Sequence, residues 1–107
     1  MGAPGGVNDL AQRVQSGAFS GTGAGAGVAL CGPFNLSVWG TFVATVVVER
    51  SFDGGTTWLP LSLDTYGTTV SLTAPCSLIV SEPETGVLYR LRCSAFTSGT
   101  ASWRLSQ

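Results

Sequence analysis

The sequence predicts an all-β fold, a two-sheet antiparallel sandwich preceded by a short N-terminal arm, and three observations support this. From Pro33 onward, apolar and polar residues alternate in short runs, the pattern of strands buried on one face. The runs recur about every 10 residues and are separated by turns rich in glycine, serine and threonine. Because 44% of the 107 residues are hydrophobic and 10% are charged, the chain is expected to fold around one core. Jelly-roll and immunoglobulin-like topologies both stay open.

The arm comprises residues 1–17 and the sandwich domain residues 18–107. Within the arm, Leu10 and Val14 lie four residues apart after an asparagine that could cap a helix, which predicts two helical turns at most. A helix this short is marginal alone, so the arm is expected to become ordered when it lies against a partner. The glycine-rich stretch 21–27 lacks the lysine of a phosphate-binding loop and is expected to be a flexible connector or a sheet edge.

Strands are expected at residues 34–40, 41–52, 56–64, 68–74, 76–82, 86–96 and 100–107. Three consecutive valines, 46–48, mark the second strand as central and covered on both faces, and Pro60 marks the third as an edge. The "TSG" at 97–99 is expected to close a hairpin between the last two strands. In the strand at 86–96, the residues expected to point inward are Val87, Tyr89, Leu91, Cys93 and Ala95.

Residues 51–58 read Ser-x-Asp-x-Gly-x-Thr-Trp, which resembles the Asp-box of sialidases and related β-propeller proteins. The chemistry of the motif is that of a turn. Asp53 can accept hydrogen bonds from backbone N–H groups, the two glycines can adopt positive φ, and the tryptophan ring can cover the reversal. A structural role is therefore expected for Ser51, Asp53, Gly54, Gly55, Thr57 and Trp58.

The residue types also exclude several kinds of chemistry. The chain has no histidine, and Cys31, Cys76 and Cys93 form no Cys-x-x-Cys pair, so zinc sites and base-activated nucleophiles are not expected. A sialidase needs a tyrosine nucleophile with an arginine cluster, on a propeller whose blades together exceed this length. We expect no catalytic residue, no metal and no cofactor.

The charge balance bears on the partners. All five basic residues are arginine and the net charge is -1, so nucleic-acid binding is not expected, and no apolar run is long enough to span a bilayer. A charge-poor surface suits a subunit whose faces are partly buried against neighbours, and arginine tolerates such burial. The expected contact residues are Arg90, Arg92, Arg104 and Trp39, with Leu10 and Val14 of the arm.

The stretches at 40–61 and 82–107, which contain "ERSFDGGTTW" and "GVLYRLRC", resemble small β-sandwich proteins encoded among the structural genes of tailed bacteriophages. This resemblance implies a non-enzymatic virion component made in the host cytoplasm. The commonest role is a capsid decoration (cement) protein on the capsid surface, where it bridges capsomers and contacts the major capsid protein and its own copies. Two alternatives stay open. One is a receptor- or glycan-binding module of a fibre or tail, with Trp39 or Trp58 stacking on sugars; the other is a head–tail adaptor or completion protein.

Overall fold

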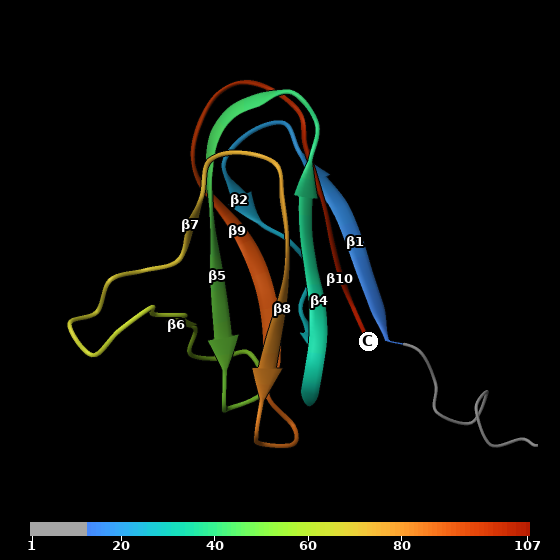
Figure 1. Ribbon diagram of the computed structural model, residues 1–107, viewed down its shortest axis with the longest axis vertical. Helices are drawn as coiled ribbons and strands as arrows, with labels where there is room; N and C mark the ends of the chain where they lie inside the picture. The colour runs from blue at the N-terminus through green and yellow to red at the C-terminus, as the bar shows by residue number, and fades with distance from the viewer. Residues whose placement is uncertain (1–12) are drawn as a thin grey trace, which may run out of the picture.

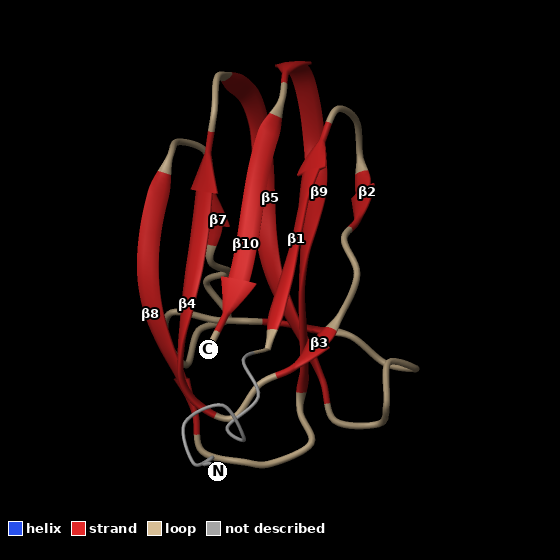
Figure 2. Cartoon of the chain, turned by 90° about the vertical axis from the view of Figure 1, so that its right-hand side faces the viewer, coloured by secondary structure: helices blue, strands red, loops and turns tan. Residues whose placement is uncertain are grey.

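The computed structural model describes residues 13–107, which form ten strands and no helix. Two antiparallel sheets pack together (Figures 1 and 2), which confirms the predicted two-sheet sandwich. The β4 sheet has the order β1-β10-β4-β8, and the β5 sheet has the order β2-β9-β5-β6, with β3 beside β9 and β7 beside β5. The strands are β1 (Val14–Phe19), β2 (Gly23–Ala24), β3 (Val28–Ala29), β4 (Gly32–Trp39), β5 (Phe42–Ser51), β6 (Leu59–Pro60), β7 (Ser71–Leu72), β8 (Cys76–Glu82), β9 (Leu88–Gly99) and β10 (Ala101–Ser106).

The end of the predicted arm belongs to the sandwich. β1 begins at Val14 and pairs antiparallel with β10 along its whole length, and its last residue, Phe19, is buried with its ring stacked on Trp103 at 5.9 Å between centroids. The helical interpretation of Val14 is therefore wrong. Pairing with β10 bonds the backbone groups on one side of the strand along all six residues, whereas two isolated helical turns would leave most of their N–H and C=O groups open. Leu10 lies outside the described residues.

The glycine-rich stretch 21–27 forms a sheet edge, one of the two structures expected of it. β2 and β3 both pair with β9, and the backbone around them lies on the ring of Trp103. A Cβ atom added to Gly25 would come within 2.5 Å of that ring, and one added to Gly17 within 3.0 Å. Any other residue would place its Cβ atom against the Trp103 ring, so the glycines allow the backbone to pack on this ring.

The alternation predicted for the strands places the core. Along β4, Phe34, Leu36 and Val38 are at most 2% exposed, while the residues between them lie on the outer face of the sheet. β5 is central as predicted, with β9 on one side and β6 and β7 on the other, and the three valines 46–48 are all buried. β6 is a two-residue edge strand that contains Pro60, in agreement with the sequence.

Ala95 was predicted to point inward, but it is exposed. Cys93 pairs with Val46, and Ala95 pairs with the adjacent Thr45, so one extra residue of β9 lies between the two pairs. Such a bulge shifts the alternation by one position. Phe96 then packs against the core instead, and the sequence periodicity gives the correct face only as far as Cys93.

The hairpin predicted between the last two strands is wrong. β9 lies in the β5 sheet and β10 in the β4 sheet, so the chain crosses between sheets at this point. Both strands point their apolar side chains into the same core from opposite sides. Alternation along the sequence is the same for two strands that face each other across a core as for two neighbours in one sheet, so it could not separate the two arrangements.

A second crossing, from β4 to β5, lies beside the first at one end of the sandwich (Figure 1). The Thr100 N–H donates a hydrogen bond to the Thr41 carbonyl oxygen at 2.9 Å, which joins the two connections. Gly40 and Gly99 adopt φ values of 113° and 87°. A Cβ atom on Gly40 would lie 2.6 Å from the Thr100 oxygen, and one on Gly99 would overlap the Thr41 oxygen. The glycines therefore let the two crossings touch.

Candidate functional site

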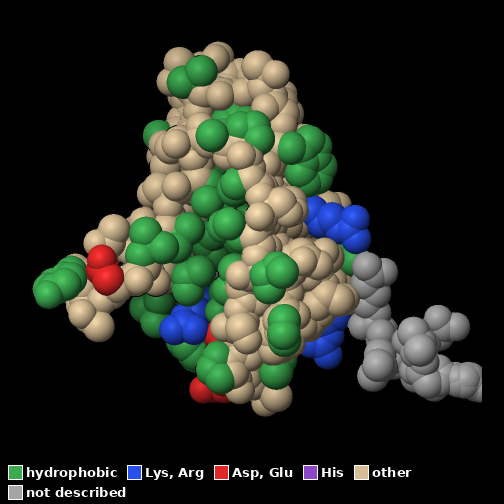
Figure 3. Space-filling model, viewed as in Figure 1, with side chains coloured by type: hydrophobic (Ala, Val, Ile, Leu, Met, Phe, Trp, Pro, Cys, Tyr) green, Lys and Arg blue, Asp and Glu red, His purple; other side chains and the backbone are tan. Residues whose placement is uncertain are grey.

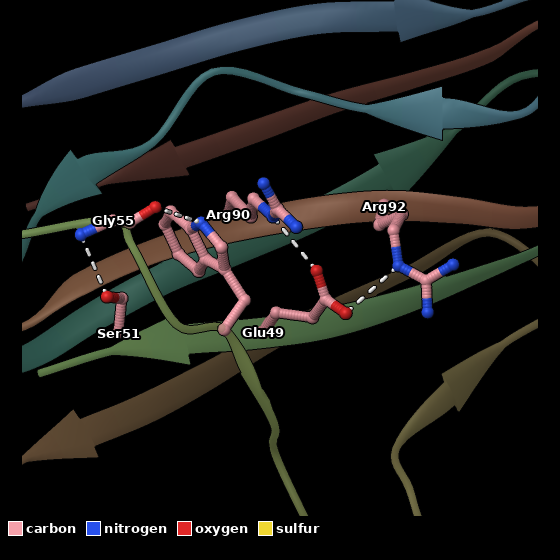
Figure 4. Close-up of polar contacts among 6 residues, drawn as sticks. Glu49, Ser51, Gly55, Arg90 and Arg92 are labelled. Atoms are coloured by element: carbon pink, nitrogen blue, oxygen red, sulfur yellow. Dashed lines mark hydrogen bonds and ion pairs between the residues drawn. The ribbon is translucent and has the colours of Figure 1, made fainter. Parts of the chain in front are cut away.

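The Asp-box forms the turn that joins β5 to β6. The carboxylate atom Oδ1 of Asp53 accepts hydrogen bonds from the N–H groups of Thr56 (3.1 Å) and Thr57 (2.8 Å) and from the hydroxyl of Ser51 (2.8 Å). Ser51, which is buried, also accepts a bond from the Gly55 N–H at 2.9 Å (Figure 4). Each of these polar groups bonds within the turn, so Asp53 binds backbone, as the sequence predicts.

The tryptophan of the motif covers the turn and reaches the neighbouring strand. The indole Nε1–H of Trp58 donates to the Gly55 carbonyl oxygen at 3.0 Å, while Gly54 and Gly55 adopt positive φ values of 75° and 97°. The guanidinium of Arg90 lies over the Trp58 ring at 4.2 Å from its centroid, a cation–π contact. This ring face is therefore occupied within the protein, which leaves it unsuited to stacking on a sugar.

Replacing Asp53 with alanine is expected to lower the unfolding temperature at neutral pH. The Thr57 N–H, with the Ser51 hydroxyl and the other turn donors, lowers the pKa of Asp53 from 3.8 to about 2. A carboxylate whose pKa is lowered in the folded state stabilises the protein at pH values above its ordinary pKa. That contribution is lost as the pH falls through the folded-state pKa. Calorimetry of both proteins should therefore show a gap in unfolding temperature that closes between about pH 4 and pH 2.

Glu84→Ala removes an exposed carboxylate outside the turn and controls for the loss of one negative charge. A constant gap between wild type and Asp53→Ala across the acid range would contradict the role assigned to the ionised carboxylate.

Glu49 links the two arginines of β9 on the outer face of the β5 sheet. Its Oε1 accepts a hydrogen bond from Nε of Arg90 and its Oε2 one from Nε of Arg92, both at 2.9 Å (Figure 4). Burial raises the pKa of Glu49, but the bonds from Arg92 and Arg90 outweigh it, so the pKa lies below its ordinary value. The predicted contact residues Arg90 and Arg92 are thus paired within their own sheet, and only their terminal guanidinium nitrogens are left to reach a partner.

A tyrosine, a glutamate and an arginine meet in the interior between the sheets. Tyr89 donates its hydroxyl hydrogen to Oε1 of Glu82 at 2.8 Å, and Arg50 Nη1 bonds the same oxygen at 2.8 Å. This is the residue set that tyrosine-based glycoside cleavage would need. Here Tyr89 is 0% and Glu82 1% exposed, and burial and Glu82 raise the pKa of Tyr89 to about 12. A phenol that is buried and has a raised pKa is a poor nucleophile at neutral pH, and in this structure its hydroxyl bonds Glu82.

Two surface hollows contain no acid or base. The larger, of about 370 Å³, is lined by residues 17–25 and Trp103, and the other, of about 320 Å³, by residues 42–45 with Thr73, Ala95 and Thr97. Within residues 13–107 no group of three cysteine, aspartate or glutamate side chains could hold a metal ion. Residues 13–107 also include no helix that is long and apolar enough to cross a membrane.

The outer face of the β4 sheet gathers the other predicted contact residues. The register places Val14, Arg104 and Trp39 on this one face, in the adjacent strands β1, β10 and β4. Val14 is 42% and Trp39 48% exposed. Serines surround them, and the hydroxyls of Ser37 and Ser77 bond each other at 2.8 Å. Arg104 is the one charged side chain on this face among the described strand residues. Figure 3 views the molecule with β8 in front, and on that side the uppermost part of the described surface shows no charged group.

The six predicted contact residues therefore do not form one surface. Arg90 and Arg92 lie on the β5 sheet, the other three described ones lie on the β4 sheet, and Leu10 is outside the described residues. Glu49 was missed as the group that joins Arg90 to Arg92. The sequence contains a pattern that predicts this pairing. Glu49 follows the three valines of a central strand, and two outward-facing arginines lie in a later strand. Opposite charges on the same face of adjacent strands favour a cross-strand pair.

A projecting hairpin between β6 and β7 was also missed. The N–H of Leu63 donates to the Thr68 oxygen at 2.7 Å and that of Val70 to the Leu61 oxygen at 2.9 Å, and Tyr66 within the hairpin is 93% exposed. Figure 1 shows this segment extending away from the sandwich.

Comparison with protein-family models, curated proteins and solved structures finds no match to this chain.

Proposed function

We propose that this chain is a non-enzymatic structural protein of a tailed-phage virion, a capsid decoration (cement) protein that binds the major capsid protein. The observation that carries the proposal is the outer face of the β4 sheet, where Val14 and Trp39 lie near Arg104 on a serine-rich surface. The core of a protein–protein interface is depleted in charge and enriched in tryptophan and arginine. This face shares the low charge of an interface core and its exposed tryptophan and arginine, and these features suit a protein partner, whereas its serines are typical of ordinary surface.

The ionisable groups support a binding role over a chemical one. Glu49, Asp53 and Glu82 each accept two or more hydrogen bonds from neighbouring groups, so each has a structural function. A cement protein needs no more than modest affinity at each contact, because symmetry repeats the contact over the shell and contacts made together by linked copies reinforce each other through a high effective concentration. A small sandwich with one charge-poor face meets that need.

The virion assignment is tested by quantitative mass spectrometry of purified particles of the phage that encodes the chain. A cement protein is expected at on the order of hundreds of copies per particle, since it follows the symmetry of the shell. Tens of copies or fewer would overturn the cement role in favour of a tail module or a head–tail adaptor. Complete absence from the particle would overturn the virion assignment.

The surface assignment is tested by binding of purified protein to shells that lack it. Trp39→Ala and Arg104→Ala are each expected to weaken binding by about tenfold to thirtyfold, the effect of removing a central interface residue. Tyr66→Ala is the matched control, because Tyr66 is highly exposed but lies on the projecting hairpin. Equal losses for all three variants, or a loss for Tyr66→Ala alone, would overturn the assignment of this face. Specific binding of the isolated protein on a glycan array, abolished by Trp39→Ala, would favour the glycan-binding alternative.

A further inference from the structure

β8 forms an open edge of the β4 sheet. It pairs with β4 on one side, and no other described strand lies on its second side (Figure 2). Proteins usually protect such edges with charges, prolines, bulges or very short strands. The described edges of the β5 sheet are two-residue strands, but β8 has seven residues, and its register with β4 runs from Gly32 opposite Glu82 to Val38 opposite Cys76 without a shift. Between residues 76 and 81 it contains no charge and no proline.

The hydrogen bonds of Gln107 show which backbone groups of β8 face the open side. Gln107 follows β10, on the far side of β4 from β8, and its Nε2 donates to the carbonyl oxygens of Cys31 (2.5 Å) and Pro33 (3.3 Å). The carbonyl of Pro33 therefore points away from β8, and its partner Ser81 is in a pair that exchanges no backbone bonds. Pairs that exchange backbone bonds alternate with pairs that do not along an antiparallel ladder, so Ile79 and Ser77, at every second position before Ser81, are in pairs of the same kind as Ser81. The N–H and C=O groups of Ser77, Ile79 and Ser81 therefore point to the open edge.

The side chains of β8 are symmetric about Ile79. The sequence of residues 77–81 is Ser-Leu-Ile-Val-Ser, which has the same polarity pattern in both directions. If two copies run antiparallel about a twofold axis, Ile79 lies opposite Ile79, leucine lies opposite valine, and serine lies opposite serine. Ile79 is 77% and Leu78 41% exposed, so the pairing would cover apolar surface on both faces of the sheet.

We infer that β8 is a self-association edge, through which two copies of this chain join their β4 sheets into one continuous antiparallel sheet. Three pairs of residues exchange backbone hydrogen bonds across the axis: Ile79 with Ile79, and Ser77 with Ser81 twice. The contact is isologous, so it closes at the dimer and leaves no second β8 edge for further growth. It requires no virion partner and does not depend on the proposed function.

The test uses the full chain in analytical ultracentrifugation over a range of concentrations. Wild type is expected to dimerise reversibly, and Ile79→Lys is expected to weaken the dimer at least about tenfold, because two ammonium groups would then face each other at the axis. The fold should tolerate this change because the side chain is mostly in solvent. Leu63→Lys is the matched control, since Leu63 is 70% exposed on the projecting hairpin, and it should leave dimerisation unchanged.

A mixing experiment tests the register. Ile79→Lys and Ile79→Glu should each dimerise more weakly than wild type when alone and more tightly when mixed, since only a residue that lies opposite itself across the axis gains an opposite charge in this way. In the wild-type dimer the Ile79 amide should be protected from hydrogen exchange and should lose this protection on dilution. A monomeric wild type at all concentrations, a dimer unaffected by Ile79→Lys, open-ended assembly, or a mixture that stays monomeric would overturn the inference.

Discussion

Replacing Gly99 with alanine is expected to destabilise the sandwich by about 4 kcal/mol, the sum of backbone strain and steric overlap. Gly99 adopts a φ of 87°, a conformation that L residues other than asparagine and aspartate rarely adopt. Its added Cβ atom would also overlap the carbonyl oxygen of Thr41, which accepts the hydrogen bond from Thr100. Because this bond joins the two crossings between the sheets, the variant should unfold at markedly lower denaturant concentration.

Gly86→Ala separates the two causes. Gly86 has nearly the same φ, 80°, but a Cβ atom there would meet nothing within 4 Å, so only the strain of about 1–2 kcal/mol is expected. Equilibrium denaturation of both variants by circular dichroism gives the difference directly. If Gly99→Ala were no less stable than Gly86→Ala, the packing of the two crossings would contribute little, and the connection would have to relax without cost.

The sequence predicted the features of the fold that depend on neighbouring residues. The long strands β4, β5, β8, β9 and β10, the central position of the three valines at 46–48 and the edge position of Pro60 follow from alternation and backbone chemistry, and they are present. The strands predicted at 56–64 and 68–74 are only two residues long, as β6 and β7, and β1 to β3 were not predicted. Sheet membership does not follow from these rules. The connection at 97–99 has the length and composition of a hairpin turn, yet it joins different sheets, and the bulge that turns Ala95 outward is a mismatch of length between β9 and β5.

The same division applies to the candidate site. The bonds of Asp53 link residues at most four positions apart, so the turn could be derived from the motif. The bonds of Glu49 to Arg90 and Arg92 span 41 and 43 positions, and they exist because β5 and β9 are paired in one register. Arg90 and Arg92 were therefore predicted as free contact residues, although their carboxylate partner was visible in the sequence.

Replacing Glu82 with alanine is expected to cost about 3 kcal/mol, the lower end of the range for removing one partner of a buried charged pair. The lower end applies because the Arg50 side chain is 33% exposed and can reach water. The Tyr89 hydroxyl, on a residue with 0% exposure, would lose its acceptor, and the Glu84 N–H would lose the bond at 2.9 Å to Oε2 of Glu82. Such a loss is a large fraction of the total stability of a small domain.

Glu82→Gln tests whether geometry or charge stabilises this cluster. The amide oxygen can still accept from Tyr89, so a smaller cost of about 1–2 kcal/mol is expected. Burial raises the pKa of Glu82, but bonds from Tyr89, Glu84 and Arg50 prevail and hold it below the ordinary 4.5. The advantage of wild type over Glu82→Gln is thus expected in full above pH 4.5 and should be lost as the pH falls through the lower folded-state pKa. Equal costs for alanine and glutamine would show that charge alone stabilises the cluster, and a cost for alanine below about 1 kcal/mol would mean that water replaces the carboxylate.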